Sequence, residues 1–273
     1  MFDQSAIQEL TKAQAIASAN KAITDQLESL VALPNDYQLH DLEPYLTYRR
    51  RARGVMNTSS LQDFAAYTQA CAEEGASVFV SAEEMTATAV LNLGTPDEPG
   101  HADSRAKLEL RKTAAYQALV QHAGGRALSQ TAAAEFLEDW IDQVECLNEA
   151  GEVKAHYAVA AIRKLTIESM RKLESSEQSL GASRSAFESV QATSAAPIPT
   201  TIRFQCEPYH GLAERTFVLR LGVQTGGDKP AIMLRIIKAE QHAQEMATEL
   251  ADLVRKELSA TVMVMLGTYS SKA

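Results

Sequence analysis

The strongest constraint on the fold lies near the C-terminus, where three consecutive segments alternate apolar and polar side chains. Segments 202–206, 217–223 and 232–236 each place an apolar residue at every second position. This period of two is typical of strands that bury one face. The sequence Gly226-Gly227-Asp228 joins the last two segments and predicts a hairpin turn. We therefore expect three strands, the last two of which pair antiparallel.

A helix and a fourth strand are expected to follow. Apolar residues recur on one helical face over about residues 239–258. Segment 261–266 is apolar on both sides, which predicts an interior strand. The order β-β-β-α-β predicts an antiparallel-rich sheet packed on a helix. Because the proline-containing segment 195–199 breaks any helix, we expect a boundary between region 1–194 and region 195–273.

The N-terminal region, residues 1–194, is predicted to mix helices and strands. A long helix is expected from about Ser5 to Val31, because apolar residues recur at helical spacing and Pro34 ends the run. The other expected elements are strands at 77–81, 86–93 and 106–112, and helices at about 61–71, 113–122, 129–142 and 153–174. The chain as a whole is therefore predicted to be an α+β protein.

The long N-terminal helix carries an apolar stripe that needs a partner. The stripe consists of Leu10, Ala13, Ile16, Ala17, Ile23, Leu27 and Leu30. A terminal helix of this kind buries its stripe either on its own body or on a neighbouring subunit. This pattern predicts that the protein forms a homo-oligomer.

Charge and cysteine content bound the compartment and the partners. The 35 acidic and 26 basic side chains give a net charge of −9, which opposes indiscriminate binding to nucleic acid. The three cysteines lie far apart without a CxxC spacing, which predicts free thiols rather than disulfides or structural zinc. The polar N-terminus is unlike a signal peptide, and no apolar run is long enough to span a membrane. These features predict a cytoplasmic protein without a membrane partner.

The strongest local concentration of charge is a short arginine cluster flanked by tyrosines. Its residues are Tyr45, Tyr48, Arg49, Arg50, Arg51 and Arg53. Guanidinium groups bind phosphates or acidic side chains, and tyrosine rings stack on nucleic-acid bases. The alternative interpretation is that the arginines neutralise Asp41 and Glu43 or form a subunit contact. We keep the cluster as a candidate binding site.

A second candidate is the loop of residues 100–105, which contains His101, Asp103 and Arg105. His and Asp two positions apart are able to share a metal ion or a proton. A hydrolytic zinc site needs a third ligand, and the histidines have no H-E-x-x-H or similar spacing. A hydrogen-bonded loop that precedes a strand explains the same residues.

No motif predicts a cofactor. Gly222, Gly226 and Gly227 match neither the P-loop nor the G-x-G-x-x-G pattern. No pair of carboxylates stands apart from the many solvated ones, so no general acid or base is assigned. The sequence therefore predicts neither a catalytic residue nor a metal ligand.

Short motifs spread over nearly the whole chain resemble the YfdQ-like family of phages and prophages, a domain of unknown function. They are Leu33-Pro34, Asp41-Leu42-Glu43, Arg53-Gly54, Phe64 with Tyr67, loop 100–106, Leu128-Ser129-Gln130, Glu135-Phe136-Leu137-Glu138, Ser183-Arg184-Ser185-Ala186, Pro208-Tyr209 and Leu266-Gly267. Ser104 and Tyr116 depart from the family pattern, in which His and Trp are expected, and this argues against a strict metal site around His101. The resemblance implies a phage-encoded accessory protein in the bacterial host, expressed near recombination or counter-defence genes.

Three hypotheses for function follow. The first is a non-enzymatic accessory protein that binds a host defence or recombination factor, as a homo-oligomer. The second is an accessory protein of phage recombination that binds nucleic acid through the Arg49–Arg53 cluster. The third is an enzyme whose site forms around His101, Asp103 and Arg105.

Overall fold

The computed structural model describes residues 4–27, 43–148, 151–164, 198–224 and 231–270. The chain divides into two units, Met1–Ala52 and Arg53–Ala273. The first unit contains helix α1 (Gln4–Leu27) and the short 3-10 helix η1 (Glu43–Tyr45). The long N-terminal helix is thus confirmed over its described residues.

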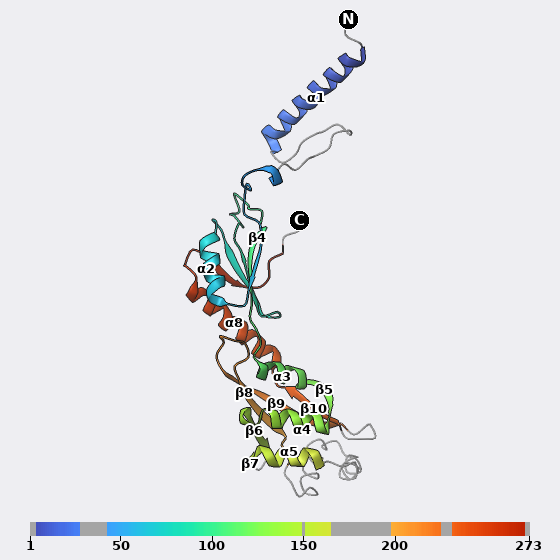
Figure 1. The fold of residues 1–273 in the computed structure, drawn as a ribbon, viewed down its shortest axis with the longest axis vertical. Helices are drawn as coiled ribbons and strands as arrows, with labels where there is room; N and C mark the ends of the chain where they lie inside the picture. Colours follow the sequence, from blue (N-terminus) through green and yellow to red (C-terminus); the bar gives the residue numbers. More distant parts are fainter. Residues whose placement is uncertain (1–3, 28–42, 149–150, 165–197, 225–230, 271–273) are drawn as a thin grey trace. The chain divides into compact units, whose positions relative to one another are not determined.

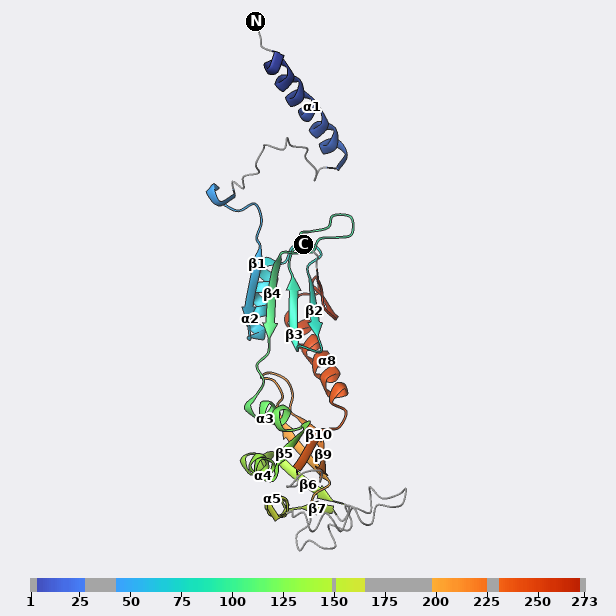
Figure 2. The ribbon, with the colours of Figure 1, turned by 90° about the vertical axis from the view of Figure 1, so that its right-hand side faces the viewer.

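The second unit contains a five-stranded mixed sheet in the order β1-β4-β3-β2-β11. The two edge strands pair parallel, β1 with β4 and β11 with β2, whereas the inner pairs are antiparallel. Helices α2 (Leu61–Cys71) and α8 (Ala239–Glu257) pack against one face of this sheet, as Figure 2 shows. The strand bounds are β1 Gly54–Thr58, β2 Ser77–Ser81, β3 Thr86–Val90, β4 Ser104–Glu109 and β11 Met263–Leu266.

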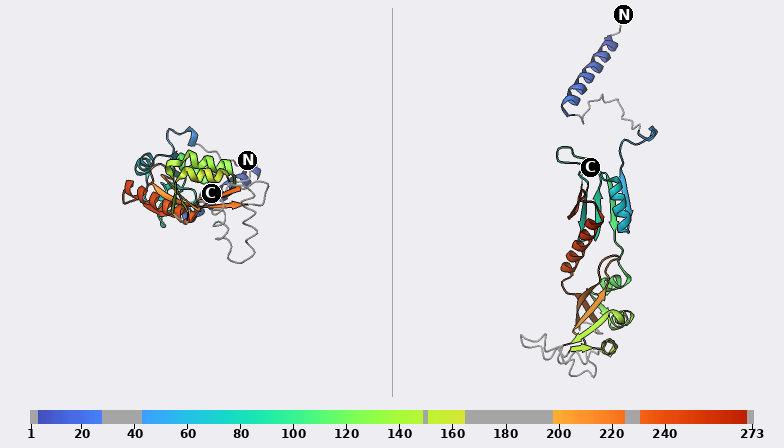
Figure 3. Two further views of the ribbon diagram at one scale, coloured as in Figure 1. Left: turned by 90° about the horizontal axis from the view of Figure 1, so that it is seen from below. Right: turned by 90° about the vertical axis from the view of Figure 1, so that its left-hand side faces the viewer.

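A six-stranded antiparallel sheet in the order β5-β10-β9-β8-β6-β7 forms the rest of the second unit (Figure 1). Phe204 of this sheet is fully buried between Phe136 and Trp140, with ring-centroid distances of 5.7 and 6.3 Å. Helices α3 (Ala114–His122), α4 (Gln130–Asp139) and α5 (Ala155–Lys164) lie on the same side of the sheet (Figure 3). The strand bounds are β5 Gly124–Ser129, β6 Val144–Asn148, β7 Gly151–Val153, β8 Thr201–Cys206, β9 Arg215–Gln224 and β10 Ala231–Ile236.

These elements confirm the α+β class and most of the expected strands and helices. The predicted hairpin is confirmed by its pairing, because Gln224 at the end of β9 lies opposite Ala231 at the start of β10. Its turn residues, Gly226-Gly227-Asp228, lie outside the described residues. The helix expected at 153–174 is described only as α5, and the one expected at 129–142 ends at Asp139, before a 3-10 turn over Ile141–Gln143.

The C-terminal elements occur in the expected β-β-β-α-β order, but they do not form one sheet. Strands β8, β9 and β10 belong to the six-stranded sheet, whereas α8 leads the chain to the five-stranded sheet, where β11 pairs with β2. The prediction of an interior strand at 261–266 is wrong, because β11 is an edge strand and Met263 is 62% exposed. The expected boundary at 194/195 lies outside the described residues, and both sheets contain strands from either side of it.

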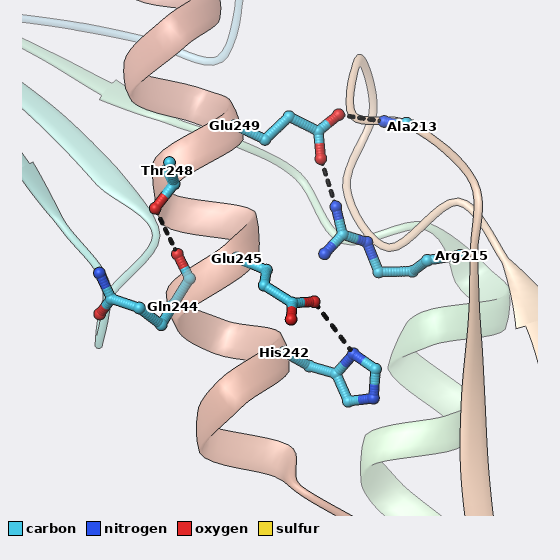
Figure 4. A network of polar contacts seen from close by, with 7 residues as sticks. All are labelled: Ala213, Arg215, His242, Gln244, Glu245, Thr248 and Glu249. Atoms are coloured by element: carbon cyan, nitrogen blue, oxygen red, sulfur yellow. Dashed lines mark hydrogen bonds and ion pairs between the residues drawn. The ribbon is translucent and has the colours of Figure 1, made fainter.

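The junction between the two sheets is held by backbone pairing and by one half-buried ion pair. Lys112 and Tyr209 form an isolated antiparallel bridge, and His210 N–H donates to Arg111 C=O at 3.0 Å. Glu249 of α8 accepts hydrogen bonds from the Arg215 guanidinium and from the backbone N–H of Ala213 (Figure 4). Both charged side chains are largely buried. Removing either one would therefore leave the other as an unpaired charge in the protein interior, which destabilises the fold.

His242, one turn from the start of α8, packs its ring on Phe217 at 4.9 Å. Burial lowers the pKa of His242, although Glu245 acts in the opposite direction. A lowered folded-state pKa means that the unfolded chain binds the extra proton more readily. The neutral ring therefore contributes stability above the unfolded pKa, and that contribution is lost as the pH falls from the unfolded pKa through the lowered folded-state pKa.

Leu250 lies on the buried face of α8 and is fully inaccessible to solvent. We expect Leu250→Ala to lower the free energy of unfolding by about 2–5 kcal/mol, since it leaves a cavity between helix and sheet. Chemical denaturation monitored by circular dichroism measures this loss. Met263→Ala in β11, where the side chain is 62% exposed, is the matched control and should change stability by less than about 0.5 kcal/mol. Equal effects for the two variants would contradict the assigned core face of α8.

Candidate functional site

The tyrosine–arginine segment, residues 45–53, exposes two large aromatic side chains. Tyr45 and Tyr48 are 86% and 83% exposed. Tyr45 is the last residue of the 3-10 helix η1, and Tyr48 follows it. The backbone N–H of Arg50 donates to the Glu43 carboxylate at 3.4 Å. Aromatic rings this accessible are typical of surfaces that bind a partner. Burial of such a ring removes a large apolar area from water and therefore contributes strongly to binding.

The predicted arginine cluster is divided between the two units. Arg49, Arg50 and Arg51 share the first unit with the two tyrosines, whereas Arg53 belongs to the second unit, directly before β1. The side chains of Arg49 and Arg50 are exposed and that of Arg51 is half-buried. Glu43, one of the two acids proposed as partners, accepts a backbone hydrogen bond, and Asp41 lies outside the described residues. The first unit therefore offers cationic and aromatic groups on one short, accessible segment.

The His101 loop is organised by Asn92, which follows β3. The buried Asn92 side chain accepts a hydrogen bond from Ser104 N–H at 3.0 Å and donates to the Asp103 carboxylate at 2.8 Å. Its backbone carbonyl also accepts from Ala102 N–H at 3.1 Å. Asp103 thus has a structural partner in the loop itself. The same is true of Arg105, which donates from Nε to the Ala102 carbonyl at 2.8 Å.

The backbone of this loop is tightly packed. A Cβ atom at Gly100 would lie 2.1 Å from the Asn92 carbonyl oxygen, so no larger residue fits there. Ala102 is buried with a φ of 55°, in the left-handed region that residues other than glycine seldom adopt. These features support the interpretation of a hydrogen-bonded loop before a strand. His101 is exposed at its surface, and no group of three potential metal ligands occurs among the described residues.

The described cysteines at buried positions are poor nucleophiles. Burial raises the pKa values of Cys146 and Cys206 to about 12, with a smaller contribution from neighbouring carboxylates. Both thiols are therefore protonated at neutral pH, when only a thiolate would react. Burial likewise raises the pKa of Tyr116 to about 12. Cys206 is buried in the core.

The structure adds a third group of basic residues that the sequence analysis does not single out. Arg203, Arg220 and Arg235 are exposed residues of β8, β9 and β10. They alternate with buried residues of the same strands, such as Leu219 and Leu234, and therefore lie on the face of the sheet away from α4. We call this face, with its three arginines, the arginine face. The alternation is visible in the sequence, but the strand register that brings the arginines together is not.

The fold and these surfaces define an α+β protein with two mixed or antiparallel sheets and several accessible cationic groups. The chain belongs to the uncharacterized conserved protein family DUF2303, whose family model matches residues 3–269. The matched residues include α1 and all strands of both sheets, so the family model covers both units. No curated protein and no solved structure matches the chain. None of the helices in the described part of the chain is long and apolar enough to cross a membrane.

Replacing Asn92 tests whether the His101 loop depends on it. We expect Asn92→Ala to lower the free energy of unfolding by about 1–3 kcal/mol, since the buried N–H of Ser104 then loses its acceptor. Thermal or urea denaturation provides the measurement. The matched control is Thr95→Ala, which removes a side-chain hydrogen bond at the exposed tip of the same loop and should cost less than about 1 kcal/mol. A loss in the control as large as that of Asn92→Ala would be evidence against this account.

Proposed function

We propose that the chain is a phage- or prophage-encoded accessory protein that acts by binding rather than by catalysis in the cytoplasm of the bacterial host. The origin rests on the resemblance to the YfdQ-like family, and the mode of action rests on the surfaces of the molecule. The single observation that carries the proposal is the exposure of Tyr45 and Tyr48 beside Arg49 and Arg50.

Tyrosine and arginine are the side chains that most often dominate the energy of protein interfaces. A tyrosine buries a large apolar area at a low entropic cost, and an arginine forms paired hydrogen bonds with carboxylates. An exposed segment with both residue types favours a protein partner with an acidic rim around an apolar pocket. A host defence or recombination factor with such a surface is the proposed target.

Self-association is the second part of the proposal, and α1 supports it. Ile7 is 53% exposed and Leu10 is 64% exposed in the single chain. An isolated helix is only marginally stable in water, because nucleation is costly and the apolar residues stay hydrated. A second copy of α1 is able to bury these apolar side chains, and it is available whenever the protein is present.

Deleting residues 1–31 is expected to convert an oligomer into a folded monomer, because the apolar surface of α1 is removed. Multi-angle light scattering at tens of micromolar measures the mass of both forms. The full-length double variant Ile7→Glu/Leu10→Glu should dissociate in the same way, since it places charge in the contact. A full-length protein that is already monomeric would overturn this part of the proposal, as would a double variant that keeps the oligomer mass. A deleted chain that unfolds would assign α1 to the protein's own core.

A second candidate function is binding of nucleic acid by the same segment, favoured by the combination of exposed tyrosine rings with the exposed guanidinium groups of Arg49 and Arg50. Single-stranded nucleic acid is commonly bound by aromatic rings that stack on bases and by cations that contact phosphates. The net charge of −9 opposes this on average, so any such affinity must be local and steeply dependent on salt.

One set of variants separates the two candidates. Tyr45→Ala/Tyr48→Ala should abolish capture of the protein target from host lysate, read by mass spectrometry, because it removes the two aromatic anchors. Tyr157→Ala, an exposed tyrosine of α5, is the matched control and should leave capture unchanged. Changing Arg49, Arg50, Arg51 and Arg53 to Ala should abolish binding to labelled DNA and its salt dependence if the second candidate holds. Target capture by the tyrosine variant at the level of the control would overturn the first candidate.

A further inference from the structure

The arginine face places two like charges directly opposite each other. Arg220 of β9 pairs in register with Arg235 of β10. Residues opposite each other on one face of an antiparallel pair have Cβ atoms about 4.5–5.5 Å apart, and like charges in this position are destabilising. Neither guanidinium has a hydrogen bond or an ion-pair partner within the described part of the chain. Two adjacent, exposed arginines that lower the stability of the sheet suggest that a bound anion compensates for them.

The surroundings keep this pair accessible. Arg235 lies opposite Gly124 on β5, which has no side chain, and Arg220 lies opposite Thr201 on β8, which has only a short one. The row continues through Thr201 to Leu147 on β6 and reaches its first carboxylate, Glu152, on β7, three strands away from Arg220. The two charges therefore face outward with little to shield them from a ligand.

Arg203 extends the cationic surface across a third strand. It is opposite Val218, two residues from Arg220 on β9, which makes it the diagonal neighbour of Arg220. Diagonal neighbours lie about 7–8 Å apart. The Glu145 carboxylate accepts two hydrogen bonds from Arg203 Nη1, at 3.1 and 3.2 Å, and so fixes the direction of this guanidinium. Arg203 also lines an open hollow of about 650 Å³, together with the carboxylates of Asp142, Glu145 and Glu214.

The chemistry of the pair distinguishes between classes of anion. One carboxylate carries a single charge, and one guanidinium satisfies it, as Arg203 does for Glu145 through Nη1. A phosphate group has more acceptor oxygens, so two guanidiniums are able to bind it together. Arg220 and Arg235 thus fit a phosphate better than an acidic side chain. Arg203 is placed to contact the neighbouring phosphate of the same nucleic-acid chain.

We propose that the arginine face binds the phosphate backbone of single-stranded nucleic acid, with Arg220 and Arg235 on one phosphate and Arg203 beside them. This face lacks exposed aromatic residues on its described strands, so the contact is to the backbone and not to the bases. Binding here is therefore independent of base sequence and depends strongly on salt. The proposal uses none of the residues of the tyrosine–arginine segment.

The test is fluorescence anisotropy of the full-length protein with a labelled oligothymidylate of about 20 nucleotides, which exceeds the usual site of one small binding module. Arg220→Gln/Arg235→Gln removes both charges and keeps polar side chains. It should weaken binding at least about tenfold and reduce the slope of log K against log salt by about 0.7, the loss expected for one phosphate contact on a single strand. The matched control, Arg163→Gln/Lys164→Gln, removes the same charge from two exposed residues at the end of α5 and should change affinity less than about twofold.

Several outcomes would overturn the proposal. One is an unchanged affinity in Arg220→Gln/Arg235→Gln, and another is an equal loss in the control pair, which would indicate a general charge effect. Competition by inorganic phosphate or a nucleoside triphosphate as strong as that of the oligonucleotide would point to a small ligand, and equal competition by polyglutamate to an acidic protein. The variant with Arg49, Arg50, Arg51 and Arg53 changed to Ala should retain this binding, so failure here and failure of the proposed function are distinguishable.

The stability of the variant provides an independent measurement. Removing two opposed like charges from an exposed sheet face should leave the melting temperature of Arg220→Gln/Arg235→Gln unchanged or slightly raised. An added oligonucleotide should raise the melting temperature of the wild type and not that of the variant, because only a ligand that binds the folded state stabilises it. A large fall in the melting temperature of the variant would show that the arginines serve the fold, and would contradict the proposal.

Discussion

Burial of one face of α8 is the interaction on which the second unit depends. Met246, Leu250 and Val254 are buried on this helix, and its C-terminal end contacts two other elements. Gln69 of α2 donates to the Glu257 carbonyl at 2.7 Å, and Arg255 donates to the Val264 carbonyl of β11 at 3.1 Å. The Arg215–Glu249 ion pair connects the same helix to β9. One helix thus contacts a strand of each sheet, and a change that loosens it weakens both.

Most regular elements of this fold could be predicted from the sequence because their periodicity is strong. Strand β9 alternates over its whole length, and α8 carries a continuous apolar stripe. Strand β5 was missed for a physical reason: Gly124 and Gly125 look like a helix end, and five of its six residues are exposed. This strand exists because β10 offers it a pairing edge, and that tertiary contact leaves no pattern in the sequence.

The candidate sites show the same division between local and non-local information. Tyr45, Tyr48 and the arginines that follow are neighbours in the chain, so their proximity is evident from the sequence. The structure adds their exposure, which no local pattern determines. Arg220 and Arg235 are neighbours only through the register of β9 and β10. Asn92 has its structural role only because the loop brings Asp103 and Ser104 back to its side chain. Sequence analysis finds clusters that are contiguous and misses those made by pairing.

The parallel edge strands of the five-stranded sheet have a consequence for how the chain reaches its native state during synthesis. Strand β1 begins at Gly54, and β11, at the opposite edge, ends at Leu266. All six strands of the other sheet lie between them in sequence. The first four strands therefore emerge from the ribosome before α8 and β11, and they keep the β2 edge unpaired and the face that α8 will cover exposed until Leu266 has been added. Such a surface is prone to aggregation in the interval, so the sheet that starts first is the one that finishes last.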